Sequence, residues 1–394
     1  YGTAVGAGTL FLPIQLGSAG AVVLFLTAIL AWPLTYWPHK ALCQFILASQ
    51  CDPHQDGITA AVRQFFGQKV GNFISGLYFI AFFVVILIYA VAITNSLAEQ
   101  LAQHMQVGQS TRVMLSLGVV AVLNLIFLTG RRVTIRVMGL LVFPLIAWFL
   151  FLSFYLTSHW QPSLLTSGLT YTPSTLHDIW FSVPVMVFAF SHTPIISTFA
   201  VAQREKYADQ AMAKCKKIMK VAYLIIAVSV MFFVFSCFMS IPASNVLLAK
   251  QQGLTILSAL AMMPSSAGWL SVAGIIVAVV AMSKSFLGTY FGVIEGASQL
   301  VSSAAQQAGY HPGAKLSRGL SVAIVSAITF IVCCMNPNAL SMIYAISGPL
   351  IALILFIMPT LSCWLVPALR PYRSVANLLV LIIGILCVSV MFFK

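Results

Sequence analysis

Eleven stretches of this chain are apolar over enough residues to cross a lipid bilayer as α-helices. A hydrocarbon core about 30 Å thick needs roughly 20 apolar residues of helix, and a helix satisfies its own backbone hydrogen bonds in lipid. The stretches are 1–19, 20–48, 69–98, 112–130, 133–157, 178–202, 218–241, 266–294, 317–335, 338–366 and 374–393. No soluble domain of 394 residues buries a composition that is 60% hydrophobic and 7% charged. The sequence therefore predicts an all-α polytopic membrane protein with eleven transmembrane helices.

The basic residues of the chain indicate its topology. A net charge of +13 would suggest a nucleic-acid partner in a soluble protein. With these spans, however, sixteen of the 20 Lys and Arg residues fall on one side of the membrane, and the other side carries Arg112, Lys250 and Lys394. Short loops rich in Lys and Arg remain in the cytoplasm. We therefore expect a cytoplasmic N-terminus, a C-terminus on the opposite face, membrane lipid as a partner and no nucleic acid.

Two of the spans are interrupted at corresponding places in the two halves of the chain. The interruptions are marked by Gly2, Gly6, Gly8 and Pro13 in the first span and by Pro184 and Pro194 in the sixth. Five is an odd number, so two consecutive five-helix units have inverted topology, and matching broken helices indicate the binding site of a transporter. We expect a first repeat at 1–157, an inverted repeat at 178–366 and an additional helix at 374–394.

The glycines of the first span allow it to unwind near the middle of the membrane. Unwinding exposes N–H groups that can hold a carboxylate and carbonyl groups that can hold an ammonium. Such backbone is tolerated in a membrane only where it lines a cavity or is buried in protein. Gly2 and Gly6 also match the GxxxG pattern of close helix packing, which is the alternative. The second broken helix favours substrate contact.

The polar group Ser191-His192-Thr193 lies where Pro194 interrupts the sixth helix. A hydroxyl there can meet a substrate amine or hydroxyl. His192 titrates near neutral pH, which makes it a candidate proton carrier. Alternatively, it bonds a freed carbonyl and has only a structural role. Both interpretations of His192 remain open.

Lys284 is the only charged residue between Gln251 and Ile294. An unpaired charge at the bilayer centre costs at least about 2.5–3.5 kcal/mol, so a lysine kept there usually holds an ion, a proton or a substrate. A lysine near a helix end can instead extend to the interface, but apolar residues continue for about two turns beyond Lys284. Burial favours the uncharged amine, which would link proton loss and gain at Lys284 to closing and opening.

The remaining polar and titratable residues give weaker signals. His39 lies at the inner boundary of the second span and is interpreted as a membrane anchor, whereas Asn124 suggests a hydrogen bond between helices. The segment 241–264 is either an amphipathic helix over the outer mouth or a plain connector. The eight cysteines show no CxxC spacing and the seven histidines are scattered, so we expect no metal, no cofactor and no enzymatic activity.

Five stretches of the chain resemble the bacterial hydroxy/aromatic amino acid permease family, and most closely its serine/threonine transporter branch. They are YGTAVGAGTLFLP, PVMVFAFSHTPIISTFA, REKYADQAMAKCKKI, KSFLGTYFG and ISGPLIA, and the similarity covers essentially the whole chain. The family is similar to the amino acid/polyamine/organocation superfamily, whose LeuT-type fold has a five-plus-five inverted repeat. The resemblance implies a symporter of the bacterial inner membrane, with a periplasmic C-terminus, that imports serine or threonine with protons by alternating access. An aromatic substrate is the alternative.

The resemblance also implies site residues by position. It implies that Thr3, Ala4, Gly6, Ala7, Gly8 and Thr9 line the first break and that Ser191, His192 and Thr193 face them. The carbonyls of Gly2 and Val5 would lie near the position of sodium in sodium-driven relatives, with Ser283, Lys284 and Ser285 opposite. The chain has no intramembrane carboxylate for sodium, which favours protons. A channel would need a continuous polar face and a membrane enzyme a nucleophile with a base, and the sequence shows neither.

Overall fold

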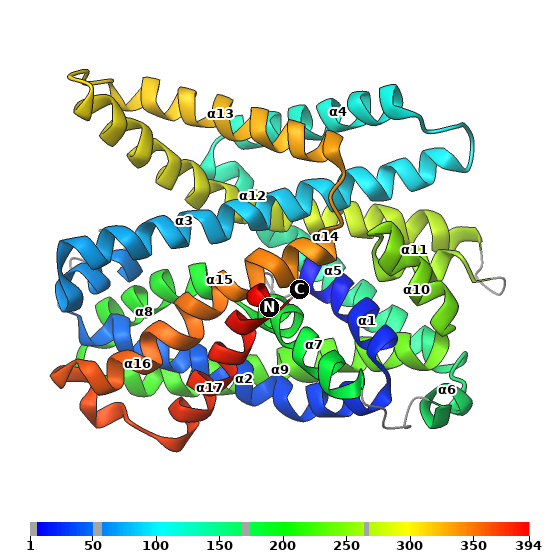
Figure 1. The fold of residues 1–394 in the computed structure, drawn as a ribbon, viewed down its shortest axis with the longest axis horizontal. Helices are drawn as coiled ribbons and strands as arrows, with labels where there is room; N and C mark the ends of the chain where they lie inside the picture. The colour runs from blue at the N-terminus through cyan, green and yellow to red at the C-terminus, as the bar shows by residue number, and fades with distance from the viewer. Residues whose placement is uncertain (1–5, 50–56, 168–173, 264–267, 394) are drawn as a thin grey trace.

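The computed structural model describes residues 6–49, 57–167, 174–263 and 268–393, and all regular structure in these ranges is helical. This confirms the predicted all-α class. The longer helices, drawn in Figure 1, are α1 Ala7–Ala19, α2 Ala21–Ala48, α3 Gly57–Ala102, α4 Gln109–Leu128, α5 Arg131–Thr157, α7 Ser174–Phe190, α8 Thr193–Tyr207, α9 Ala211–Ser240, α12 Gly268–Gln307, α13 Ala314–Met335 and α17 Val375–Ser389. The shorter helices are α6 Pro162–Ser167, α10 Ala243–Gln252, α11 Ile256–Ala261, α14 Ala339–Met342, α15 Gly348–Ala352 and α16 Met358–Leu365.

Short 3₁₀ and π turns complete the secondary structure. The 3₁₀ turns are η1 Ala208–Gln210, η4 Pro367–Tyr372 and η5 Val390–Phe392. The π turns η2 Ile343–Ser347 and η3 Leu353–Ile357 join α14, α15 and α16 into one continuous apolar run, Ala339–Leu365. A π turn adds a residue to a helical turn and changes the faces that the side chains on either side present.

Nine helical runs in the described ranges are long and apolar enough to cross a membrane. They are Ala21–Ala48, Ile58–Ala102, Gln109–Leu128, Arg132–Thr157, Thr193–Ser240, Gly268–Gln307, Ala314–Met335, Ala339–Leu365 and Val375–Phe392. Two of the eleven expected spans are described as shorter helices. The first is the 13-residue α1, and the sixth divides into the 17-residue α7 and α8, which runs on into α9.

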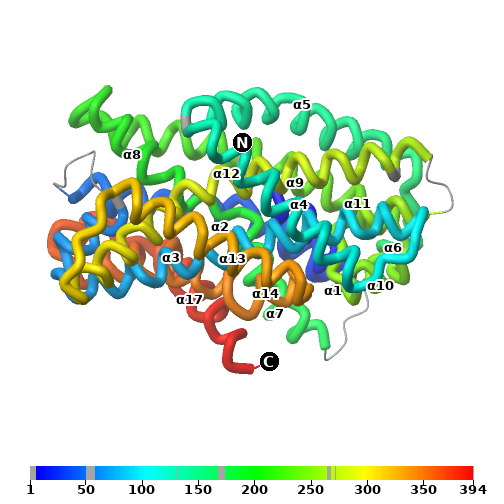
Figure 2. Tube along the Cα trace, turned by 90° about the horizontal axis from the view of Figure 1, so that it is seen from above, coloured from blue at the N-terminus to red at the C-terminus, as the bar shows by residue number. Residues whose placement is uncertain are grey.

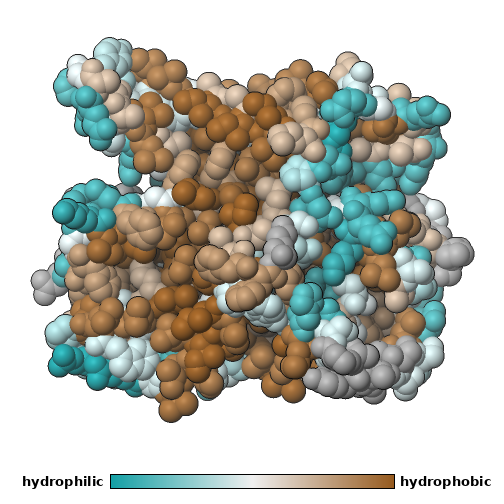
Figure 3. Space-filling model, in the orientation of Figure 1, coloured by the Kyte–Doolittle hydropathy of each residue, from teal (hydrophilic) through white to brown (hydrophobic). Residues whose placement is uncertain are grey.

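The surface of the protein is suited to lipid. In Figure 3 hydrophobic residues cover much of the middle of the visible face, and hydrophilic residues gather mainly towards its left and right ends. Large apolar side chains are exposed on the peripheral helices, for example Leu125 on α4 (65%), Phe143 on α5 (73%) and Ile331 on α13 (53%). Such a continuous apolar surface is stable only against acyl chains or another protein. The chain is therefore a multi-pass membrane protein.

The helices pack into two groups. In one group α1 and α2 contact each other and both contact α7 and α9, and in the other α3, α4, α12 and α13 contact one another. Figure 1 shows the second group in the upper part of the view and the first group below α3. Figure 2, turned by 90°, shows α5 along one edge, beside α9 and α12. Each group combines helices from both halves of the chain, so neither half packs as a separate domain.

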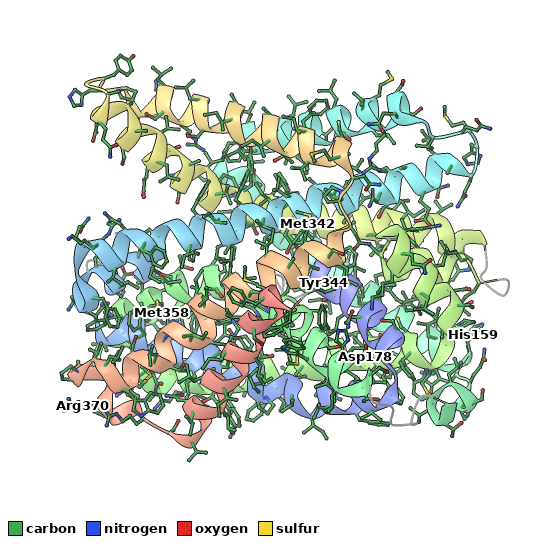
Figure 4. All side chains as sticks on the ribbon, viewed as in Figure 1. His159, Asp178, Met342, Tyr344, Met358 and Arg370 are labelled. Carbon is green, nitrogen blue, oxygen red and sulfur yellow. The ribbon has the colours of Figure 1, made fainter. Side chains whose placement is uncertain are left out.

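The segment 241–264 is helical in its described part, as the first of the two alternatives expected, but it forms two short helices and not one. Val246 of α10 and Leu257 and Leu260 of α11 are buried, because α10 packs on α1 and α11 packs on α12. These helices cover the end of the bundle where His159 lies, opposite the end where Arg370 lies (Figure 4). The segment is therefore a packed cover rather than a plain connector.

Close packing between α7 and α15 depends on Gly348. A Cβ atom at this position would lie 2.6 Å from the carbonyl oxygen of Pro184, a distance that real Cβ atoms do not show. At Gly118 on α4, by contrast, an added Cβ would meet no atom within 4 Å. The two glycines therefore differ in packing while both lie in helices.

We expect Gly348→Ala to lower the thermal unfolding temperature of the purified protein in detergent. Overpacking costs about 1–3 kcal/mol because α7 and α15 must separate to admit the methyl group. Gly118→Ala is the control and should leave the temperature unchanged or raise it slightly, since alanine favours helix. Equal melting temperatures for the two variants would contradict the close approach.

Candidate functional site

Three helices meet the start of α1. Gly6 precedes α1, and a Cβ atom added there would lie 2.6 Å from Oγ of Ser285 on α12 and 3.5 Å from the hydroxyl of Tyr89 on α3. The Tyr89 side chain is hydrogen-bonded to Ser285. The ring of Tyr89 also contacts that of Phe188 on α7, with centroids 6.5 Å apart. The structure thus brings Gly6 close to Ser285 and Tyr89.

The other expected residues of the first span divide into two sets. Gly2, Thr3, Ala4 and Val5 lie outside the described residues, so unwinding of the first span before Gly6 remains a prediction. Ala7, Gly8 and Thr9 form the buried first turn of α1. A Cβ atom at Gly8 would collide with Cα of Ala189, so this glycine allows close packing of α1 on α7. The GxxxG alternative was raised for Gly2 and Gly6, so the close contact at Gly8 is a finding of the structure alone.

The sixth span is broken as its prolines predict. α7 ends at Phe190 and α8 begins at Thr193, and Ser191 and His192 lie between them outside either helix. The hydroxyl oxygens of Ser191 and Thr193 are 2.9 Å apart and share a hydrogen bond. Nδ1 of His192 lies 2.8 Å from the carbonyl oxygen of Phe190 and donates to it. Side chains of the junction therefore satisfy one another and part of the freed backbone.

His192 shows both of the features that the sequence left open. Its Nδ1 bonds a freed carbonyl, which is the structural role. Its Nε2 is buried and has no hydrogen-bond partner in the described part of the chain. An imidazole that donates from Nδ1 has a lone pair on Nε2 when it is neutral. His192 can therefore stabilise the junction and also accept a proton or a hydrogen bond.

His39 belongs to the same site, and its interpretation as a membrane anchor is wrong. Its side chain is 1% exposed, and its Nε2 lies 2.8 Å from the backbone nitrogen of His192, which donates to it. Its ring contacts those of His192 and Tyr223, with centroids 5.5 Å and 4.9 Å away. The anchor interpretation placed His39 at the inner boundary of the second span, whereas the rotation of α2 about its axis turns this side chain towards His192 and Tyr223.

A cavity of about 430 Å³ lies between α5, α8, α9 and α12. Its polar lining residues are Lys284, His192 and Tyr223, and apolar side chains such as Met138, Phe199 and Ile226 form most of the remainder. Cavities of this size that are mostly apolar and carry a few polar groups are typical of small-molecule sites. Lys284 and His192 thus face a common space from different helices.

The amine of Lys284 is buried inside the protein. The residue is 5% exposed, and its Nζ has no hydrogen-bond partner among the described residues. The side chain therefore does not extend to the membrane surface, and the interfacial alternative does not apply. An unpaired ammonium in such a place is costly, so charge on Lys284 depends on what enters the cavity or on a change of conformation.

Ser283 does not share the environment of Lys284. It lines a separate groove of about 500 Å³ between α3, α4 and α12, together with apolar residues such as Ile93 and Val119. Consecutive residues on a helix point about 100° apart, so neighbours in the sequence face different surroundings. Of the three residues expected to act together, Ser285 faces α1, Lys284 faces the cavity and Ser283 faces neither.

A polar network closes the end of the bundle that α10 and α11 cover. Nζ of Lys250 donates to Oγ of Ser18 over 2.8 Å, and Asn338 donates to the carbonyl of Lys250 over 2.8 Å. Arg112 donates to Oδ1 of Asn95 over 2.8 Å. Asn95 in turn donates to the carbonyl of Gly253. These bonds tie α10 and the residue after it to α1, α3 and α14, and α3 to α4.

Two further expectations concern metals and Asn124. The described residues contain no group of three His, Cys, Asp or Glu side chains that could hold a metal ion. Asn124 accepts a hydrogen bond from the hydroxyl of Tyr290 over 2.8 Å and another from Ser326 over 3.1 Å. The predicted bond between helices at Asn124 is confirmed, and it joins α4, α12 and α13.

Known proteins are similar to this chain over nearly its whole length. A family model described as the tryptophan/tyrosine permease family matches residues 1–392. The chain is 70% identical over 394 residues to the inner membrane transport protein YqeG of Escherichia coli (strain K12), covering 100% of this chain and 96% of that protein. It is 37% identical over 402 residues to the serine transporter SdaC of Escherichia coli (strain K12), covering 100% and 92%. It is 34% identical over 414 residues to the threonine/serine transporter TdcC of Edwardsiella tarda, covering 98% and 92%.

We expect Lys284→Met to raise the thermal unfolding temperature of the purified protein. Methionine keeps the length of the side chain and removes a buried amine, whose burial in an apolar site costs about 1–3 kcal/mol by protein mutational measures. Lys315→Met is the matched control, because Lys315 is exposed and its loss should change the temperature little. A lower melting temperature for the Lys284 variant would show that the amine is paired in the folded protein.

Proposed function

Because this chain belongs to the tryptophan/tyrosine permease family, we propose that it is a proton-coupled symporter that imports serine or threonine by alternating access. The family resemblance carried by the sequence motifs is confirmed, and the chain is an amino acid permease by family. The substrate, the proton coupling and the direction of transport form the proposal. Its membrane is the bacterial inner membrane, the location that the name of the relative from Escherichia coli carries.

The observation that carries the proposal is that the amine of Lys284 and Nε2 of His192 are both buried without a hydrogen-bond partner among the described residues. The two residues line one cavity, and the residue after Lys284, Ser285, lies against the start of α1. In the described conformation the neutral amine is favoured, because a charge there has no partner among the described side chains. A proton on Lys284 therefore favours a different arrangement or a bound anion. Protonation of Lys284 is thereby coupled to substrate binding and to the conformation of the protein.

The proposed substrate is a small hydroxylated amino acid. Two relatives that align with nearly the whole chain are named as a serine transporter and a threonine/serine transporter. At the start of α1 the space beside Gly6 is occupied by Tyr89 and Ser285, and Phe188 is packed against Tyr89. Large side chains already fill this region, which favours a small substrate over an aromatic one. An aromatic amino acid remains the second candidate within the same family.

The substrate site of the proposal consists of Thr3, Ala4, Gly6, Ala7, Gly8, Thr9, Ser191, His192 and Thr193. The substrate carboxylate binds N–H groups around Gly6–Gly8, and its ammonium binds carbonyl groups of both breaks. Lys284 carries the coupled proton, with Ser283, Ser285 and the carbonyls of Gly2 and Val5 in its proposed surroundings. Ser283 is the weakest member of this set, because it lines a different groove.

The proposed architecture is the LeuT-type inverted repeat, with 1–157 and 178–366 as the repeats and 374–394 as an additional helix. It is supported by the two packed groups, since α1, α2, α7 and α9 are the first two helices of each half, and α3, α4, α12 and α13 are the next two. The N-terminus would be cytoplasmic and the C-terminus periplasmic. Alternating access is supported by the closed network around α10, with the Lys284 cavity open elsewhere.

We expect Lys284→Met to abolish accumulation of serine driven by a pH gradient in proteoliposomes while binding of serine is largely retained. A methionine cannot carry a proton, so transport loses its link to the gradient. The measurement is uptake of labelled L-serine with and without an imposed gradient, and Lys315→Met should behave like the unchanged protein. Gradient-driven uptake by the Lys284 variant at the unchanged rate would refute the coupling role.

We expect L-serine and L-threonine to raise the unfolding temperature of the purified protein more than L-tryptophan or L-tyrosine does. Ligands that bind only the folded protein stabilise it by mass action, by about 2.7 kcal/mol at a hundredfold excess over Kd. A thermal-shift screen of the twenty amino acids at two pH values measures this directly. A larger shift with the aromatic amino acids would favour an aromatic substrate. Single-channel currents in a planar bilayer would show that the protein is a channel and not a symporter.

A further inference from the structure

The two hydrogen bonds of His39 determine which of its ring nitrogens carries a proton. Nδ1 lies 2.6 Å from the carbonyl oxygen of Thr35, which can only accept, so Nδ1 carries hydrogen. Nε2 lies 2.8 Å from the backbone nitrogen of His192, which can only donate, so Nε2 has its lone pair. The described arrangement is therefore possible only with a neutral His39 in this one tautomer.

A proton on Nε2 of His39 is incompatible with the hydrogen bond to His192. The imidazolium has a donor at each nitrogen, so two N–H groups would face each other across 2.8 Å. We propose that Nε2 of His39 is a proton-binding site of this protein and that a proton bound there releases the junction of α7 and α8 from α2. The proton comes from a hydronium ion, which becomes a water molecule.

The amide that His39 holds lies at the break of the sixth span. His192 is the residue before α8, with φ −128° and ψ 26°, and its N–H lies outside the hydrogen-bond ladder of either helix. In lipid such a group has no water to bind, so an acceptor from another helix is needed. α2 supplies this acceptor from a residue 153 positions away in the sequence. Loss of the bond frees α8 to move relative to α2.

The surroundings of His39 offer no charge that would hold the proton without a change in structure. The titratable groups that contact its ring are His192 at the junction and Tyr223 on α9. Tyr36, Lys40 and Cys43 lie within about one turn on α2 itself. The helices packed against α2 also carry Arg63, Lys69, Tyr78, Tyr89 and Glu99 on α3, His177 and Asp178 on α7, Arg204, Glu205, Lys206 and Tyr207 on α8, Lys214, Cys215, Lys216, Lys217, Lys220 and Cys237 on α9, Cys363 on α16, Arg370 and Tyr372 on η4, and Cys387 on α17. No carboxylate in the described ranges is paired with His39.

These contacts also connect His39 to the proposed coupling site. Tyr223 contacts the rings of both histidines and lines the cavity together with Lys284 and His192. The inference rests on the proposed proton coupling for its role in transport, but the proton site itself follows from the geometry alone. Neutral His39 stabilises the described junction, so this stabilisation is present at higher pH and is lost as the pH falls.

Hydrogen–deuterium exchange of the whole protein in lipid nanodiscs tests the proton site without any substrate. The readout is protection of the peptide spanning 188–198 at about pH 8 and about pH 4, after correction for the intrinsic rate. The lower value lies below the usual titration range of histidine, because burial disfavours the charged form of the ring. We expect protection at the junction to fall roughly five- to tenfold at the lower pH, the size expected for one lost hydrogen bond.

Two variants separate His39 from its neighbours. In His39→Gln the amide oxygen can accept from the His192 N–H but does not titrate, so protection should be the same at both pH values. In His192→Gln the backbone N–H and His39 both remain, so the pH dependence should persist. It should also persist in Lys284→Met.

Three outcomes would overturn the proposal. They are a pH dependence that survives in His39→Gln, one that disappears in His192→Gln, and its absence in the unchanged protein. The last of these remains decisive if His39→Gln does not fold. Since no amino acid is present in the exchange experiment, failure of serine uptake would count against the proposed function and not against this site.

Discussion

The constraint on which this structure depends is that backbone polar groups inside a membrane need partners within the protein. A continuous helix supplies them, but the sixth span breaks at Ser191 and His192 and leaves groups of both helix ends unpaired. The protein meets this need locally, through Nδ1 of His192 and the carbonyl of Phe190, and from a distance, through Nε2 of His39. The break is therefore held by titratable side chains, which makes its stability depend on protons.

The same constraint applies to the buried amine of Lys284, but here the partner is missing among the described residues. It is a polar group that the described residues leave without a partner, in a cavity whose other polar groups are His192 and Tyr223. Burying such an amine costs little free energy when it is neutral and much more when it is charged. Lys284 and the two histidines thus form one region in which a change in charge cannot be absorbed without movement. In a permease this is the kind of region where an ion gradient can be converted into transport.

The arrangement of the helices places the residues of that region on different packed groups. The group of α1, α2, α7 and α9 carries both histidines and Tyr223, whereas Lys284 lies on α12 in the other group, and the cavity lies where helices of the two groups face each other. At the end covered by α10 and α11, hydrogen bonds join α10 to α1 of the first group, and the residue after α10 to α3 of the second group. Relative movement of the two groups would change the cavity and this closure together.

The sequence by itself determined the class of the protein, the break of the sixth helix and the burial of Lys284. Each depends on local properties: the length of apolar runs, the missing N–H of Pro194, and one charge among apolar neighbours. Only the tertiary structure decided that His39 bonds His192, that Tyr89 meets Ser285, and that Ser283 and Lys284 face different cavities. These facts depend on how each helix is rotated about its axis and which distant helix it packs against. Hydropathy does not encode that rotation in a helix that is apolar on every side.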